Sequence, residues 1–211
     1  MLIVENPNAQ TTLPPDLIIS DADFDAVKAL GAGPYSVPFE ILGEPIVPGF
    51  TQVPLVLQGT FIQVTNTAGS GVAQIQLRYL PTVPFVASPS GGKIKLTANL
   101  VNYNLSIIDY TSVFQNNPSS PIIYLSIPAN QTLIFGVQYV ATGLSAVAQA
   151  VAATESAGNR GIVQLTPQAG STFLATATVR QFFVSQQGSP LVPIAAAAYS
   201  VPIGGGPVIA G

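Results

Sequence analysis

Two residue types that carry much of protein chemistry are absent from this 211-residue chain, which has no cysteine and no histidine. Without cysteine there is no disulfide framework, no thiolate nucleophile and no thiolate metal site. Without histidine the chain lacks the commonest general base and the commonest ligand of transition metals. No motif arranges the remaining carboxylates, lysines, serines or tyrosines for catalysis, so we expect that the protein is not an enzyme.

Charge is also scarce. Charged residues make up 7% of the chain, with 6 basic and 9 acidic residues and a net charge of −3; an average soluble domain has roughly 25%. So few scattered basic residues exclude a nucleic-acid footprint. A charge-poor surface repels its neighbours weakly, and we therefore expect the partners to be copies of the same chain. The alternative is a monomer whose surface is wetted by uncharged polar groups.

Long apolar runs are missing as well. Proline, glycine or glutamine interrupts every apolar run well before the roughly 20 residues that a membrane-spanning helix needs. We therefore expect no membrane insertion.

The chain is rich in β-strand patterning. In residues 72–80, apolar side chains at every second position alternate with glutamine and arginine, which predicts a strand with one buried face. Further strands are expected at residues 55–66, 93–98, 103–110, 162–166 and 172–185. Roughly eight to ten strands separated by turn signals predict an all-β antiparallel fold, a β-sandwich or jelly roll.

The most strongly patterned stretch is residues 121–141. Two apolar, β-branched and aromatic runs flank Pro128-Ala-Asn-Gln131, which predicts two antiparallel strands joined by a four-residue turn. We expect this hairpin to be the central pair of the sandwich. Residues 145–155 combine the alanine content of a helix with the alternation of a strand, and both interpretations stay open.

Proline-rich segments at the two ends define the domain organisation. Residues 1–20 are expected to form an extended arm, residues 21–185 the β-sandwich domain, and residues 186–211 an extended tail. The arm begins with an apolar run, Leu2-Ile3-Val4. This run is either an edge strand or an assembly arm that pairs with the sheet edge of a neighbouring subunit.

Three aspartates near the arm have the spacing that begins a calcium-binding loop, namely Asp21, Asp23 and Asp25. The match then fails, because Ala26 stands where the loop requires glycine. We therefore favour a short N-terminal helix in residues 20–31, capped by polar residues at its start and by glycine at its end. Calcium is the one ion worth testing, and no other cofactor is expected.

Two tripeptides match the pattern for N-glycosylation. They are Asn104-Leu-Ser106 and Asn130-Gln-Thr132. Asn130 falls on the predicted turn, which is the more accessible of the two positions.

These features predict a structural, self-assembling subunit of an extracellular filament or shell, located at a cell or virion surface and linked by strand or arm exchange. One alternative is a carbohydrate- or surface-binding module of the adhesin or lectin type, although the absence of tryptophan counts against it. Another is a viral coat or decoration protein. Since no positive charge precedes Lys28, a genome-packaging coat is disfavoured.

Overall fold

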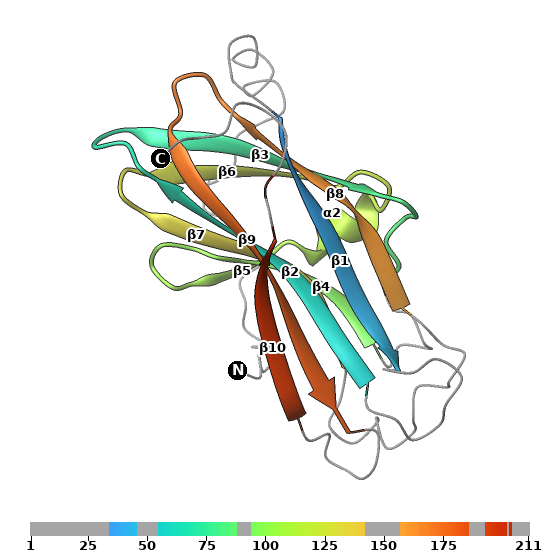
Figure 1. The fold of residues 1–211 in the computed structure, drawn as a ribbon. Coiled ribbons are helices and arrows are strands. Elements are labelled where there is room, and N and C mark those ends of the chain that lie inside the picture. The colour runs from blue at the N-terminus through green and yellow to red at the C-terminus, as the bar shows by residue number, and fades with distance from the viewer. Residues whose placement is uncertain are drawn as a thin grey trace.

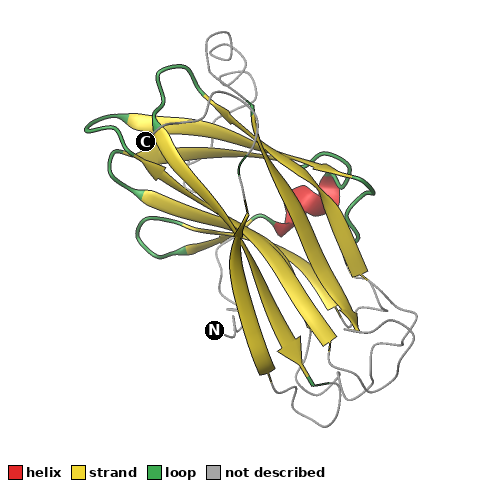
Figure 2. Ribbon diagram, in the orientation of Figure 1, coloured by secondary structure: helices red, strands yellow, loops and turns green. Residues whose placement is uncertain are grey.

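The protein is an all-β fold with one short helix, as the computed structural model shows for residues 34–45, 55–87, 94–141, 157–185, 193–201 and 203 (Figures 1 and 2). All strand pairs in these ranges are antiparallel. The elements are β1 (Tyr35–Pro45), β2 (Leu55–Asn66), β3 (Val72–Pro81), β4 (Ile94–Val101), β5 (Ile107–Asp109), α2 (Thr111–Asn116), β6 (Ile122–Pro128), β7 (Thr132–Ala141), β8 (Ala157–Pro167), β9 (Phe173–Val184) and β10 (Pro193–Val201). The predicted all-β class is confirmed.

Strand β2 is the branch point of the sheet. Along one edge its whole length pairs with β9, and β9 pairs in turn with β10. Along the other edge, residues 55–58 pair with β1 and residues 59–65 pair with β7. The order β5-β4-β7-β2-β1-β8-β3-β6 therefore belongs to one continuous sheet that curls on itself (Figure 1). The finer sandwich or jelly-roll arrangement stays a prediction.

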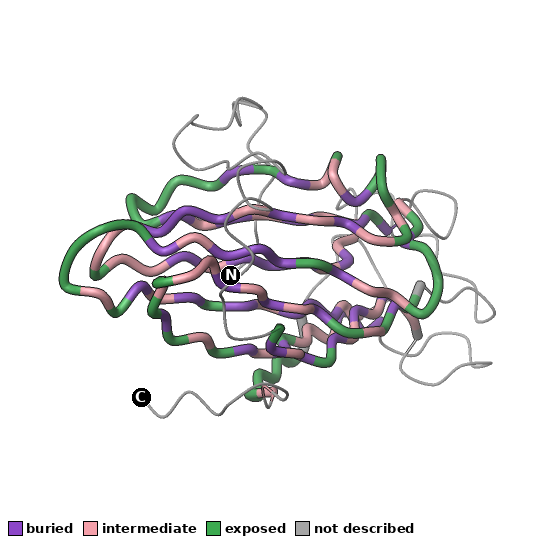
Figure 3. Tube along the Cα trace, turned by 90° about the horizontal axis from the view of Figure 1, so that it is seen from above, coloured by how far each residue is buried: buried purple, intermediate pink, exposed green. Residues whose placement is uncertain are grey.

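Alternating side chains supply the core inside this curl, and Figure 3 shows buried positions recurring along the strands. Tyr79 of β3 packs edge-to-face on Phe114 of α2, with ring centroids 5.0 Å apart, and lies 6.1 Å from Phe135 of β7. All three side chains are fully buried. Because β3 and β7 belong to opposite sides of the curl, these rings hold the two sides together.

The strands expected in residues 121–141 are present, but they do not form a hairpin. β6 pairs with β3, whereas β7 lies between β2 and β4. β6 therefore stands at one end of the strand order, and the prediction of a central hairpin was wrong. Both runs direct an apolar face to the same core, and alternation alone does not say whether two such strands pair or face one another across it.

Asn66, the last residue of β2, fastens the connection between β6 and β7. Its side chain is fully buried; Nδ2 donates to the Ile127 carbonyl at 2.8 Å, and Oδ1 accepts from the Ala68 N–H at 2.9 Å. Its backbone N–H donates to the Gln131 carbonyl, and its carbonyl accepts from the Asn130 N–H, both at 3.0 Å. All the polar groups of this residue are therefore engaged in holding the turn against β2.

The predictions for the other strands and helices were confirmed in part. The strands predicted at 55–66 and 72–80 are confirmed as β2 and β3. Of residues 103–110, only Ile107–Asp109 forms a strand, because a turn occupies the start of that range. The helix α2 was not predicted. The helix expected in residues 20–31 and the open segment 145–155 lie outside the described residues.

Candidate binding and assembly surfaces

Charged side chains in the described strands are not gathered into a reactive site. Glu40 and Arg160 form a cross-strand ion pair with an O–N distance of 3.2 Å, and their side chains are 40% and 69% exposed. Such a solvent-screened pair contributes little to stability. Asp109 is exposed, and its Oδ1 accepts a hydrogen bond from the Thr111 N–H at 2.7 Å at the start of α2. These groups serve local structure.

Buried polar side chains form hydrogen bonds at the point where the neighbour of β2 changes from β1 to β7. Gln58 Nε2 and Thr60 Oγ1 donate to the Glu40 carbonyl at 2.9 and 3.1 Å. Gln58 Oε1 accepts in turn from Gln181 Nε2. Gln58 and Thr60 are at most 1% exposed, so this cluster supports the branch in the sheet and offers no surface to a ligand.

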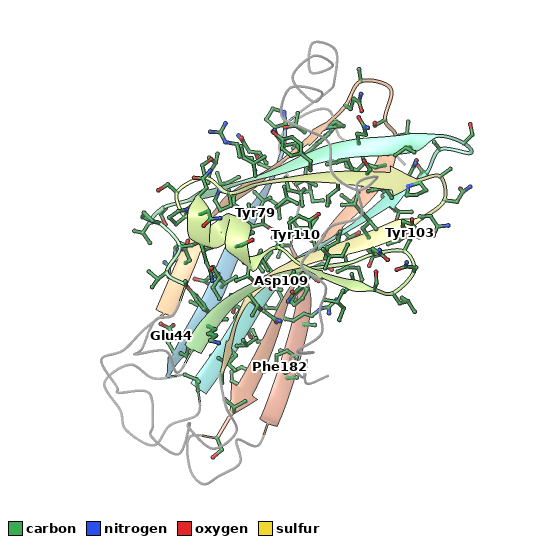
Figure 4. The ribbon with its side chains drawn as sticks, turned by 180° about the vertical axis from the view of Figure 1, so that it is seen from behind. Glu44, Tyr79, Tyr103, Asp109, Tyr110 and Phe182 are labelled. Atoms are coloured by element: carbon green, nitrogen blue, oxygen red, sulfur yellow. The ribbon has the colours of Figure 1, made fainter. Side chains whose placement is uncertain are left out.

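Three buried tyrosines remain neutral at physiological pH. Burial raises the pKa of Tyr110 to about 12 and lifts that of Tyr79 well above its ordinary value. Burial also raises the pKa of Tyr139 to about 12, and its hydroxyl donates to the Val86 carbonyl at 3.3 Å. Figure 4 shows Tyr79 and Tyr110 in the interior beside α2, where a substrate has no access.

Within the described residues, no group of three or more acidic side chains is arranged to hold a metal ion. The aspartates of the calcium hypothesis, Asp21, Asp23 and Asp25, lie outside those residues, as does the predicted arm, Leu2-Ile3-Val4. In the same part of the chain no helix has the length and apolar character needed to span a membrane.

One end of the sheet carries turns without charge. Four turns gather there, at residues 67–71, 102–106, 129–131 and 168–172, and none contains a charged residue (Figure 1). Exposed apolar side chains accompany them: Val72, Tyr103, Leu105, Ile107 and Leu174. Figure 4 places Tyr103 at the end of the molecule opposite Glu44. We call this surface the loop end.

Leu105 is the most exposed apolar side chain of the loop end, at 82%. Its backbone adopts a left-handed conformation with φ of 66°, which is unfavourable for leucine. The Leu105 N–H donates to the Asn102 carbonyl at 2.9 Å, and the Asn104 N–H donates to Asn102 Oδ1 at 2.8 Å. These bonds fix the leucine at the tip of its turn.

Both candidate glycosylation sites lie at the loop end. Asn104 and Asn130 are exposed, and Asn130 also has a left-handed backbone, with φ of 59°. Asn104 Oδ1 accepts a hydrogen bond from the Ser106 N–H at 3.0 Å. The positions are accessible, and modification at either one stays a prediction.

The second unusual surface is the outer edge of β10. Among the described strands, β10 pairs with β9 alone. Residues 195–200 are exposed on both faces of the ribbon, and the strand contains no charged residue. Beyond these residues, Val201 and Ile203 at the C-terminal end of the segment are partly buried and pack against the core.

The other described edges differ from β10. β5 has three residues and ends in the charged Asp109. β6 has seven residues, and its Ile127 carbonyl already accepts a hydrogen bond from Asn66. Of the edge strands that the structure describes, β10 is thus the longest, at nine residues, and it is uncharged.

β10 lies within residues 186–211, which were predicted to be an extended tail because they are rich in proline and glycine. The position of the prolines in the sequence was the feature that could have indicated this strand. Pro193 and Pro202 bracket eight residues without proline, and proline is tolerated at the first position of an edge strand.

Comparison with models of known protein families finds no match, and neither does comparison with curated protein sequences. The functional conclusion therefore rests on the loop end and the β10 edge.

Proposed function

We propose that the protein is a structural, self-assembling subunit of an extracellular filament or shell, in which a strand from one copy extends the sheet of another. The observation that carries this proposal is the edge of β10, which is long, uncharged and exposed on both faces. Proteins that avoid association shorten, charge, twist or cover their edge strands. Within the described residues, β10 has no such protection.

The scarcity of charge supports the same function. With 7% charged residues, little electrostatic repulsion keeps neighbouring copies apart. The loop end adds exposed apolar side chains without a charge in its four turns. A coat or decoration protein of a virion is a special case of this structural role.

A fibre or shell needs at least two contacts per subunit. In this proposal the arm with Leu2, Ile3 and Val4 supplies one contact by adding a strand to a neighbour, and the β10 edge supplies another. Deleting residues 1–15 is expected to abolish extended assembly while leaving the fold intact. Unchanged assembly in that deletion would remove the arm from the mechanism.

The proposal is tested by negative-stain electron microscopy and light scattering over a concentration series. We expect ordered fibres or shells from the wild-type chain, and their loss in Ala197→Lys, which places a charge on the β10 edge. Ser112→Lys, which adds the same charge on an exposed position of α2, is the matched control and should assemble. Monodisperse 21.7-kDa particles at every concentration would contradict the proposal.

A carbohydrate-binding module is the second candidate, and the loop end favours it. Its uncharged turns are rich in amide and hydroxyl side chains, and Tyr103 is 39% exposed there. A glycan array, probed with and without calcium, separates this candidate from the first. Binding that is lost in Tyr103→Ala, in a protein that stays monomeric, would favour the module.

A further inference from the structure

We infer that β10 pairs with β10 of a second copy, antiparallel and across a two-fold axis, so that the sheet continues from one molecule into the other. This inference rests on the proposed function and names the partner of one contact. The first support is the backbone. A strand paired on one side only presents a row of free N–H and C=O groups on the other, and an antiparallel copy satisfies both sets at once.

The side chains of β10 suit such a symmetric contact. Near a two-fold axis each residue meets its own copy, so a charge would face a like charge and a bulky side chain would face itself. Residues 195–198 are four consecutive alanines, which avoid both problems. Directly opposed residues in antiparallel strands have Cα atoms about 4.5 to 5.5 Å apart, and alanine fits that distance without rearrangement.

The register with β9 shows what the second copy would cover. Tyr199 lies opposite Val179, and Ala197 lies opposite Gln181, so these residues share one face of the ribbon. Val179 is 3% exposed on that face, whereas Tyr199 is 48% exposed. The apolar face of β9 therefore continues onto β10 without cover. In an antiparallel pair centred on Ala197, Tyr199 of the second copy would lie opposite Ala195.

The opposite face of the same ribbon carries a second uncovered apolar group. Phe182 of β9 lies opposite Ala196 and is half-buried, and Figure 4 shows it on the ribbon formed by β9 and β10. Because residues 195–200 are exposed on both faces, β10 gains little side-chain burial within its own molecule from them. A second ribbon alongside it would provide that burial.

The two-fold pair leaves a role for the arm. An isologous contact closes after two copies, so it makes a dimer and no more. Growth into a filament or shell then needs the second contact that the arm supplies in the proposed function. The β10 pair is the dimer from which such an assembly would be built.

The test uses the absence of cysteine from the chain, because a single introduced cysteine can form a disulfide only with another copy. Four variants are made separately: Ala195→Cys, Ala196→Cys, Ala197→Cys and Ala198→Cys. Each is oxidised under assembly conditions, and covalent dimers are measured on non-reducing gels. Ser112→Cys, exposed on α2, gives the background from random collisions.

Two-fold pairing predicts that the yield of covalent dimer peaks at one point along residues 195–198. Only the residue nearest the axis faces its own copy, so one position, or two adjacent ones, should give several-fold more dimer than Ser112→Cys, with less dimer on either side. Circular dichroism confirms that each variant is folded before oxidation. A peak of this kind supports the β10 pair.

Three other results would overturn the inference, and they differ in what they say about the proposed function. Ordered particles without any peak would refute the β10 pair and leave the structural function standing. Dimers that form only when the Ile3→Cys variant is mixed with the Ala197→Cys variant would show that the arm occupies this edge instead. Neither particles nor dimers at any concentration would refute both proposals.

Discussion

Replacing Asn66 by alanine tests whether one buried side chain holds the β6–β7 connection against the end of β2. The asparagine is fully buried, and its side chain makes two hydrogen bonds, to the Ile127 carbonyl and from the Ala68 N–H. The alanine variant removes both bonds. It leaves the two backbone bonds of residue 66, to the turn residues Asn130 and Gln131, in place.

The expected loss of stability follows from the two groups that Asn66→Ala leaves without a hydrogen-bond partner. Ile127 is fully buried, so its carbonyl loses a partner in a place that water does not reach, which costs about 1 to 3 kcal/mol. Ala68 is half-buried, so its N–H can turn to water and the loss is about 1 kcal/mol or less. The expected destabilisation of Asn66→Ala is therefore about 1 to 4 kcal/mol, a large part of the roughly 5 to 15 kcal/mol that stabilises a typical domain.

The assay is urea unfolding followed by circular dichroism at a concentration where the protein is monomeric. Asn104→Ala is the matched control, because that asparagine is exposed and accepts one local hydrogen bond at 3.0 Å from the Ser106 N–H. We expect the control to lose less than about 1 kcal/mol, with unchanged dependence on urea in both variants. Equal losses in the two variants would refute the role assigned to Asn66.

Three further predictions concern the core. Tyr79→Phe should leave stability unchanged or raise it slightly, because the buried hydroxyl has no hydrogen-bond partner in the described structure. Stability should hold up to pH 10 and fall above it by about 1.4 kcal/mol per pH unit for each of Tyr110 and Tyr139, since the unfolded chain ionises near pH 10 while these folded side chains keep their protons to about pH 12. Gly161→Ala should cost about 1 to 3 kcal/mol, because the new methyl group meets the backbone of β3, whereas Gly69→Ala has open space around it.

Chemical unfolding measures all three, with absorbance of ionised tyrosine added for the pH series. A loss of more than about 1 kcal/mol in Tyr79→Phe would mean that its hydroxyl has a partner. Stability that stays level to pH 12 would contradict the burial of Tyr110 and Tyr139. Gly161→Ala unfolding at the same urea concentration as Gly69→Ala would show that β3 and β8 separate easily at that point.

The sequence predicted strands better than it predicted their partners. Alternation placed β2 and β3 correctly because each strand buries one face, and that pattern is local. Whether β7 returns along β6 depends on how the chain turns after Pro128, and that turn is hydrogen-bonded to Asn66, more than 60 residues away in sequence. A short-range pattern carries no information about such a contact.

The candidate surfaces were less accessible to sequence reasoning than the core. The alanines of β10 have no strand signature, and only pairing with β9 makes that segment a strand. The exposed apolar tip at Leu105 lies in residues 103–110, which were predicted as a continuous strand; the Asn102 side chain, which accepts from the Asn104 N–H, helps to form a turn there instead. The low charge of the whole chain was evident from composition, and it led to the same expectation of association.

The most direct measurement of the central claim is hydrogen exchange at β10 across a concentration series. Alternate N–H groups of an edge strand point away from its single partner, so in the monomer about half of the amides of residues 195–200 should exchange rapidly. Assembly through this edge predicts that these amides become protected from exchange as concentration rises. In the dimer, the exchange of the amides in the turn at residues 67–71 should not change. Rapid exchange at β10 in fully assembled particles would contradict the claim.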